Sequence, residues 1–305
     1  MDMRAIISQM AVLIIIISIG YISGKAKLLT PDGSRLLSKL VIHVTTPCIM
    51  LSSVLSGDLA ITAGETAFFL LMTVPVYIVA FIVAIPASRI LCGKKTDCGM
   101  YLYMIVFSNV TFMGFPVAYA IFGPVSAFFI SLFTITFMLL NFSIGIFLVS
   151  GNDEKFSPKT LINTSFITAL ICIPIAIAGL GAPAVITDSV RILGSMTTPC
   201  AMLVIGASLS QIPIKNVFSD WRLYPMALLK MVVLPVLTWL ALRHLVSNEL
   251  MLGMLVVLSG MPVALAATMF AFEYGGNERM ASSGIFLTTI LSLATIPLIV
   301  FFLLT

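Results

Sequence analysis

The chain has 305 residues, of which 60% are hydrophobic and only 9% are charged, with a formal net charge of +4. A soluble domain carries charge on roughly a quarter of its residues, so the composition excludes an ordinary soluble protein. The mean hydropathy of +1.16 predicts membrane-spanning helices, because backbone groups within lipid must form their hydrogen bonds inside the segment. No basic run is interleaved with aromatic residues, so nucleic acid is not an expected partner.

Apolar runs of about 20 residues, the length that crosses roughly 30 Å of hydrocarbon, recur along the whole chain. We place ten spans between the charged and turn-forming residues. In chain order they cover residues 4–24, 36–56, 62–91, 98–122, 124–150, 159–180, 184–210, 222–245, 248–274 and 279–304. The sequence therefore predicts an all-α polytopic membrane protein whose surroundings are the lipid bilayer.

The positions of Lys and Arg predict how these spans are oriented. The linkers after the odd-numbered spans carry Lys25, Lys27, Arg35, Lys39, Arg89, Lys94, Lys95, Lys155, Lys159, Lys215, Arg222 and Arg279, whereas the opposite side has Arg4, Arg191 and Arg243. Cytoplasmic loops of membrane proteins are enriched in Lys and Arg. We therefore expect a multi-pass protein of the cytoplasmic membrane with both termini outside the cytoplasm.

A seven-residue pattern, Thr-Thr-Pro-Cys-x-Met-Leu, occurs at Thr45–Leu51 and again 152 positions later at Thr197–Leu203. A repeat at half of the chain length indicates a duplicated protein. Because each copy holds an odd number of spans, the second copy enters the membrane from the opposite side. We therefore predict two inverted five-helix repeats, 1–152 and 153–305, a geometry that is typical of secondary transporters.

Helix-breaking residues occur near the middle of the fourth and ninth spans, at matching positions of the two copies. The ninth span contains Ser259-Gly260-Met261-Pro262, and the fourth contains Ser108-Asn109 followed by Gly114 and Pro116. Ser and Asn are favourable N-caps, and Pro is favoured at the first helical position. The fourth and ninth helices are therefore expected to be broken and to cross at the membrane midplane. The alternative interpretation is a pair of ordinary proline kinks.

Two helix N-termini near one point would stabilise an anion, and a carboxylate is the natural ligand. Asn109 could add an amide hydrogen bond to it. The expected substrate-binding residues are Ser108, Asn109, Val110, Phe112, Gly260, Met261, Pro262 and Ala266.

Other polar groups within the spans have two interpretations each. The repeated threonines could bond carbonyl groups that the following prolines, Pro47 and Pro199, leave free. Alternatively, the two Thr-Thr-Pro segments could line the transport path or a cation site. The threonines are Thr45, Thr46, Thr197 and Thr198. Lys230 could serve substrate binding or coupling, or its long side chain could reach the membrane interface. His43 could be an interfacial polar residue or a proton relay.

The sequence around these residues resembles the auxin efflux carrier family. Asn109–Pro116 is similar to the family pattern N-x-x-x-M-G-x-P, Pro262–Tyr274 is similar to its helix 9 pattern, and Lys230 precedes Pro235 by five residues as in the family. The resemblance implies a dimeric scaffold of helices 1, 2, 6 and 7, and a transport domain of helices 3–5 and 8–10 that moves as an elevator. Two departures are Ser108, where plant members have proline, and Ala266, where many bacterial members have asparagine.

The expected function is transport of small organic anions, either mono- or dicarboxylates, by a homodimer. The alternatives are a sodium-coupled symporter similar to the bile acid symporters, and a ligand sensor that does not transport. No catalytic motif supports an enzyme, and no cofactor or metal site is expected. Coupling to sodium or to protons remains open. The five cysteines form no paired extracellular set, so no disulfide framework is expected.

Overall fold

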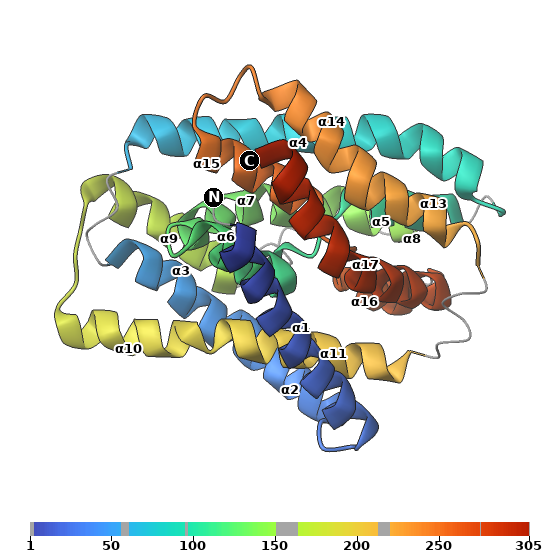
Figure 1. The fold of residues 1–305 in the computed structure, drawn as a ribbon, viewed down its shortest axis with the longest axis horizontal. Helices are drawn as coiled ribbons and strands as arrows, with labels where there is room; N and C mark the ends of the chain where they lie inside the picture. The colour runs from blue at the N-terminus through green and yellow to red at the C-terminus, as the bar shows by residue number, and fades with distance from the viewer. Residues whose placement is uncertain are drawn as a thin grey trace.

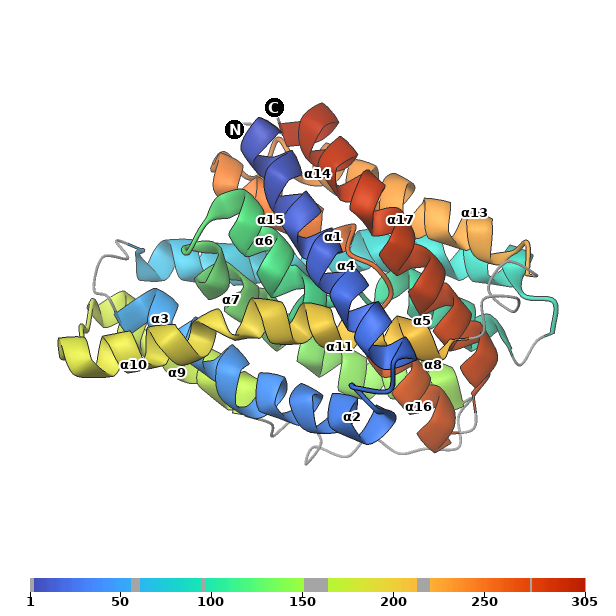
Figure 2. The ribbon, with the colours of Figure 1, turned by 60° about the horizontal axis from the view of Figure 1, so that its bottom comes forward.

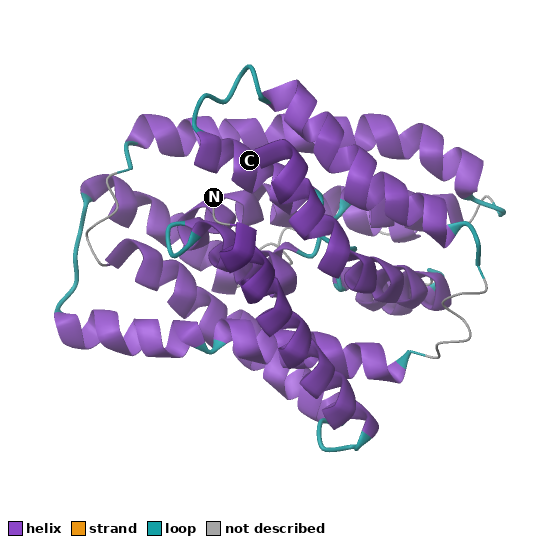
Figure 3. Cartoon of the chain, in the orientation of Figure 1, coloured by secondary structure: helices purple, strands orange, loops and turns teal. Residues whose placement is uncertain are grey.

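The computed structural model describes residues 3–55, 61–94, 97–150, 164–212, 220–274 and 276–304, and over these ranges the chain is almost entirely helical (Figures 1 and 3). The predicted all-α class is therefore confirmed. The proposed boundary between residues 152 and 153, the start of the predicted sixth span at 159–163, and Lys95, Lys155, Lys159 and Lys215 lie outside the described residues.

The first half of the chain begins with one helix and continues with helices that are joined by π-helical segments. The elements are α1 (Met3–Lys25), α2 (Pro31–Leu40), η1 (Val41–Thr45), α3 (Thr46–Leu55), α4 (Ala63–Leu91), α5 (Cys98–Val106), η3 (Val110–Gly114), α6 (Phe115–Phe122), α7 (Ser126–Leu140), η4 (Asn141–Gly145) and α8 (Ile146–Ser150). Local sequence sets some of these ends. Thr62 and Glu65 form a reciprocal capping box before α4, and Gly123 ends α6 with a φ of 75°.

The second half has a similar order of elements. They are α9 (Thr164–Ala178), α10 (Ala184–Ser195), α11 (Thr197–Gln211), α13 (Leu223–Leu228), η6 (Leu229–Val233), α14 (Leu234–Leu242), α15 (Glu249–Ser259), α16 (Ala266–Tyr274) and α17 (Glu278–Leu304). Asn248 caps α15, because its Oδ1 accepts hydrogen bonds from the backbone N–H groups of Leu250 and Met251 at 3.0 and 3.1 Å.

Among the described residues, six helical ranges are long and apolar enough to cross a membrane by length and composition. They are Pro31–Leu55, Ala63–Leu91, Ser126–Ser150, Ala184–Gln211, Leu223–Leu242 and Glu278–Leu304. Large apolar side chains also point outward: Leu71, Ile78 and Ile82 on α4 are 61%, 53% and 65% exposed. Such a surface is unfavourable in water and suits contact with lipid. The chain is therefore a multi-pass membrane protein.

Helix α1 lies across α11 with unusually close backbone contact (Figure 2). A Cβ atom added at Gly206 would overlap the carbonyl oxygen of Ile17, and one added at Gly20 would lie 2.5 Å from the carbonyl oxygen of Leu203. Gly20 and Gly24 are spaced four residues apart on α1, as are Gly206 and Ser210 on α11. Small residues at this spacing allow helices to approach closely in lipid, where packing is the main attraction between them.

The expectation that the cysteines form no disulfide is wrong for one pair. Cys92 and Cys98 are joined by a disulfide, with their Cα atoms 4.9 Å apart. The physical reason is the short connection between the end of α4 and the start of α5, which brings the two residues together. Cysteine count alone does not reveal this local turn.

Candidate functional site

Two non-helical segments from opposite halves of the chain pair with each other. Helix α5 ends at Val106 and η3 begins at Val110, whereas α15 ends at Ser259 and α16 begins at Ala266. We call the intervening residues 107–109 and 260–265 the paired segments. The backbone N–H of Asn109 donates to the carbonyl of Pro262 at 2.8 Å, and that of Ala264 donates to the carbonyl of Phe107 at 3.1 Å. This pairing satisfies backbone groups that the adjoining helices leave without partners.

Asn109 occupies the N-cap position of η3. Its Oδ1 accepts a hydrogen bond from the backbone N–H of Phe112 at 3.2 Å, which is the expected role of an N-cap. Its Nδ2 is buried and has no hydrogen-bond partner, while the whole residue is only 3% exposed. An unsatisfied buried donor costs about 1–3 kcal/mol, so this amide can bind an acceptor that is not part of the resting structure.

Lys230 reaches the paired segments from η6 and is fully buried. Its Nζ donates to the Ser108 hydroxyl at 2.7 Å and to the Val106 carbonyl at 3.3 Å. The Ser108 hydroxyl in turn donates to the Ser259 carbonyl at 3.3 Å. The lysine side chain is therefore directed at the paired segments and not at the surface of the molecule.

The remaining predicted binding residues surround the paired segments or belong to them. Val110 and Met261 are fully buried, Phe112 is 9% exposed, and Gly260 and Pro262 are also buried. Ala266 is the first residue of α16 and is partly exposed. The structure thus brings Ser108, Asn109, Met261 and Pro262 together, with Val110 and Phe112 in the first turn that follows Asn109.

One residue of this neighbourhood escapes sequence reasoning. The hydroxyl of Thr288, in α17, accepts a hydrogen bond from the backbone N–H of Val263 at 3.1 Å and donates to the carbonyl of Gly284 at 2.7 Å. It therefore holds one paired segment to a third helix. Its only signal in the sequence is a hydroxyl within an apolar span, and that signal is shared by many other residues.

The carbonyl group that Pro47 leaves free is not bonded by a repeated threonine. Because η1 is π-helical, Pro47 leaves the carbonyl of Ile42, five residues earlier, without its backbone donor. The hydroxyl of Ser165 from α9 donates to that carbonyl at 3.1 Å. Thr45 instead bonds the Val41 carbonyl at 3.5 Å. The freed carbonyl at Pro47 is thus satisfied by a serine from the other half of the chain.

The hydroxyls of Thr46 and Thr197 are buried without a hydrogen-bond partner, whereas Thr198 is partly exposed. Pro47 is buried and Pro199 is exposed. Helix α11, which begins at Thr197, packs against both η1 and η3. The second repeated pattern therefore lies on a helix that adjoins the segment following Asn109.

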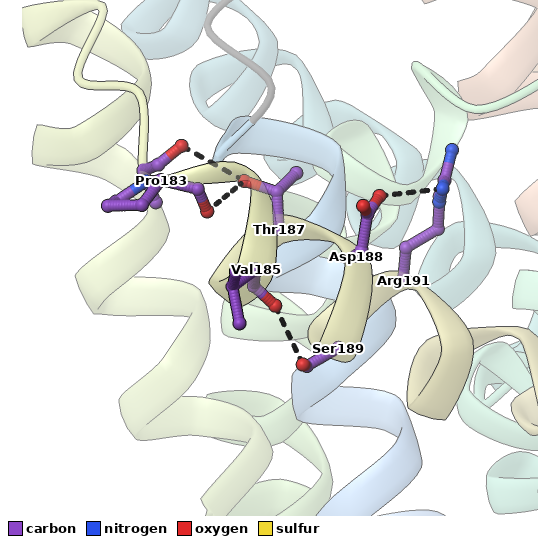
Figure 4. A network of polar contacts seen from close by, with 7 residues as sticks. Pro183, Val185, Thr187, Asp188, Ser189 and Arg191 are labelled. Carbon is purple, nitrogen blue, oxygen red and sulfur yellow. Dashed lines mark hydrogen bonds and ion pairs between the residues drawn. The ribbon is translucent and has the colours of Figure 1, made fainter.

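His43 and Arg191 each have a hydrogen-bond partner in the structure. The Nδ1 of exposed His43 lies 2.8 Å from the hydroxyl of Thr164 in α9. Within α10, the guanidinium of Arg191 donates to Asp188 at 2.6 Å. The hydroxyls of Thr187 and Ser189 donate to the carbonyls of Ala182 and Val185 (Figure 4). These contacts explain the polar groups at this end of α10 without a ligand.

Comparison with known proteins gives two findings. A family model described as membrane transport protein matches residues 5–165 and 156–300. An uncharacterized transporter of Methanocaldococcus jannaschii is 26% identical over 300 residues, which cover 94% of this chain and 95% of that relative.

Proposed function

Because the chain belongs to the membrane transport protein family, the auxin efflux carrier family, we propose that it is a secondary transporter of small organic anions. The substrates would be mono- or dicarboxylates, and the site would be the paired segments. The relative from Methanocaldococcus jannaschii carries the name of a transporter, which supports transport but names no substrate. Neither the family nor that name indicates an enzyme.

The proposed architecture has ten spans in two inverted repeats. A shift of 152 positions places α5 (Cys98–Val106) at 250–258, beside α15 (Glu249–Ser259). The same shift places the range from α7 to α8 (Ser126–Ser150) at 278–302, beside α17 (Glu278–Leu304). This agreement supports a duplication in which α5–α6 and α15–α16 are the broken fourth and ninth helices.

The packing of the helices supports a division into a scaffold and a moving body. Helices α1 and α11 pack together, as do α3 with α9 and α3 with α10, and these belong to the proposed scaffold helices 1, 2, 6 and 7. The contacts of the paired segments with Lys230 and Thr288 instead remain within the proposed transport domain. We propose that this domain moves as an elevator against a dimeric scaffold.

Both termini are proposed to lie outside the cytoplasm. An even number of spans places both termini on the same side of the membrane, and the start of α1 and the end of α17 lie near each other in both views of the fold (Figures 1 and 2). The Lys and Arg distribution supports the extracytoplasmic side.

The observation that carries this proposal is the unpartnered amide of Asn109. It lies where η3 begins, and α16 begins just after the second paired segment, so two helix starts converge near one donor. A carboxylate would accept the Nδ2 hydrogen bond and interact favourably with both helix N-termini. Because Asn109 is buried, a substrate reaches it only in a more open conformation, as alternating access requires.

The test is flux in proteoliposomes against a panel of isotopically labelled mono- and dicarboxylates. We expect saturable movement of at least one compound above that of protein-free liposomes, and loss of that movement in Asn109→Asp. Specific binding with no movement under any gradient would favour a sensor. Flux that requires a sodium gradient would favour the symporter alternative.

A further inference from the structure

The C-terminal ends of two helices meet at the paired segments, whereas the proposed anion site is formed by the helix starts that follow these segments. Val106 is the last residue of α5 and Ser259 is the last residue of α15. The free carbonyls at a helix C-terminus carry partial negative charge and attract cations. In transporters with interrupted helices, such ends commonly coordinate the sodium ion or proton that is coupled to transport.

In this protein the ammonium group of Lys230 lies at the C-terminal ends of α5 and α15. Lys230 Nζ contacts the Val106 carbonyl directly and reaches the Ser259 carbonyl through the Ser108 hydroxyl. Its partners are carbonyl and hydroxyl oxygens, which are also the groups that bind small hard cations. The lysine stands in a π-helical segment, a feature that is frequent at functional sites.

The charge of Lys230 is not balanced by an acid among the described residues. Helices α5, α13, α14 and α17 pack against η6, and their ionisable side chains are Tyr101, Tyr103, Tyr224, Glu278 and Arg279; Cys98 is held in the disulfide with Cys92. The hydroxyls of Tyr101 and Tyr103 bond to Asp220 and Asn141, while Glu278 and Arg279 are exposed in the first turn of α17. Within the described part of the chain, no carboxylate forms an ion pair with Lys230. The positive charge of Lys230 is therefore stabilised by the dipoles of a carbonyl and a hydroxyl group.

The two halves of the chain differ at this position. The residue 152 positions before Lys230 is Ile78, which is 53% exposed on α4. A single ammonium therefore serves the ends of both α5 and α15. This asymmetry fits a specific role for Lys230 better than a general requirement of the repeated fold.

We propose that Lys230 is a tethered cation that fills the ion site between the ends of α5 and α15, so that the protein needs no sodium ion there. The inference rests on the proposed transport architecture and specifies its coupling. Removal of the ammonium should leave a cation-sized space with the oxygens of Val106 and Ser108 around it. A small cation from solution should then bind in that space and restore the lost stability.

The experiment measures thermal unfolding of the purified protein without substrate, in sodium, methylammonium or N-methylglucamine chloride at equal ionic strength. We expect the parent protein to have the same melting temperature in all three salts. Lys230→Ala should melt lower in N-methylglucamine chloride and recover by about 3 °C at a salt concentration ten times the dissociation constant of sodium or methylammonium. The recovery should saturate with salt concentration.

Three further variants serve as controls. Lys230→Met fills the space without a charge and should show no recovery with either cation. Addition of Ser108→Ala to Lys230→Ala removes one ligand and should abolish the recovery. Lys39→Ala, at an exposed position of α2, should behave as the parent protein in every salt.

Two results would overturn the proposal: saturable stabilisation of the parent protein by sodium relative to N-methylglucamine, or a folded Lys230→Ala protein that neither small cation stabilises. If Lys230→Ala yields folded protein only when it is purified in sodium or methylammonium, that result supports the proposal. Failure to fold in every salt counts against it. Because these measurements need no substrate, a failure of the cation proposal is distinguishable from a failure of anion flux.

Discussion

Ser108 and Val263 form an isolated antiparallel bridge, although they come from opposite halves of the sequence. The two backbone hydrogen bonds beside this bridge fix the start of η3 relative to the segment that leads into α16. Lys230 and Thr288 then tie the bridge to two further spans. The proposed site thus joins four proposed spans through hydrogen bonds. We expect some substitutions there to affect stability and others to affect substrate binding.

Asn109→Asp should strongly weaken substrate binding while it preserves the fold. The aspartate retains an oxygen that can cap the Phe112 N–H group, but it lacks the Nδ2 donor and adds a negative charge that repels an anion. A hydrogen bond to a charged group contributes about 1.5–3 kcal/mol, so uptake at subsaturating substrate should fall roughly 10- to 100-fold. Flux and melting temperature are measured on the same preparation.

Asn109→Ala supplies the comparison, because it removes both the donor and the cap. It should reduce uptake as Asn109→Asp does and also lower stability by about 1 kcal/mol. Uptake equal to that of the parent protein in either variant would contradict the assignment of Asn109 to the substrate.

Ser108→Ala should be much more destabilising than Ser259→Ala. The Ser108 hydroxyl accepts from Lys230 and donates to the Ser259 carbonyl, so its loss leaves a buried ammonium with the Val106 carbonyl alone. Among the described residues, the Ser259 hydroxyl bonds the Val256 carbonyl within its own helix at 2.7 Å and has no cross-helix partner. The melting temperatures of the two variants test this difference, and equal values would show that the Lys230–Ser108 contact contributes little.

Thr46→Val and Thr197→Val should keep or raise the melting temperature. Both hydroxyls are buried without a partner, and replacement of an unsatisfied polar group by an apolar one of similar shape is neutral or stabilising. Flux should nevertheless fall, because we expect these hydroxyls to find partners in another state of the transport cycle. Unchanged flux in both variants would exclude a role in the path. A large loss of stability would instead indicate a structural role.

Gly206→Ala should destabilise the contact between α1 and α11. The added methyl group overlaps the Ile17 carbonyl oxygen, and overpacking of this kind typically costs about 1–3 kcal/mol. The matched control is Gly64→Ala in the first turn of α4, where the nearest atom to a new Cβ is 3.8 Å away. Thermal unfolding in detergent should show a lower melting temperature for Gly206→Ala alone. A decrease of similar size in both variants would contradict the packing argument.

Much of the candidate site could be predicted from the sequence, because several of its residues have strong preferences for helix ends or turns. Ser108, Asn109, Gly260 and Pro262 have strong local preferences, and the repeat spacing of 152 positions linked them across the two halves. Lys230 was recognisable as an unusual charge within a span, but its partner was not. Thr288 and the Ser165 hydroxyl at the Ile42 carbonyl were not recognisable at all, because a hydroxyl in an apolar helix has the same local signature whether or not a distant group needs it.

The sequence by itself indicated that this protein lies in a membrane and is helical, because hydrophobicity and backbone preference act over a few neighbouring residues. Only the tertiary structure decided that the amide of Asn109 is left without a partner and that the Lys230 ammonium points to Ser108. Hydrogen bonds act over about 3 Å, and which groups come within that distance depends on how helices from both halves pack.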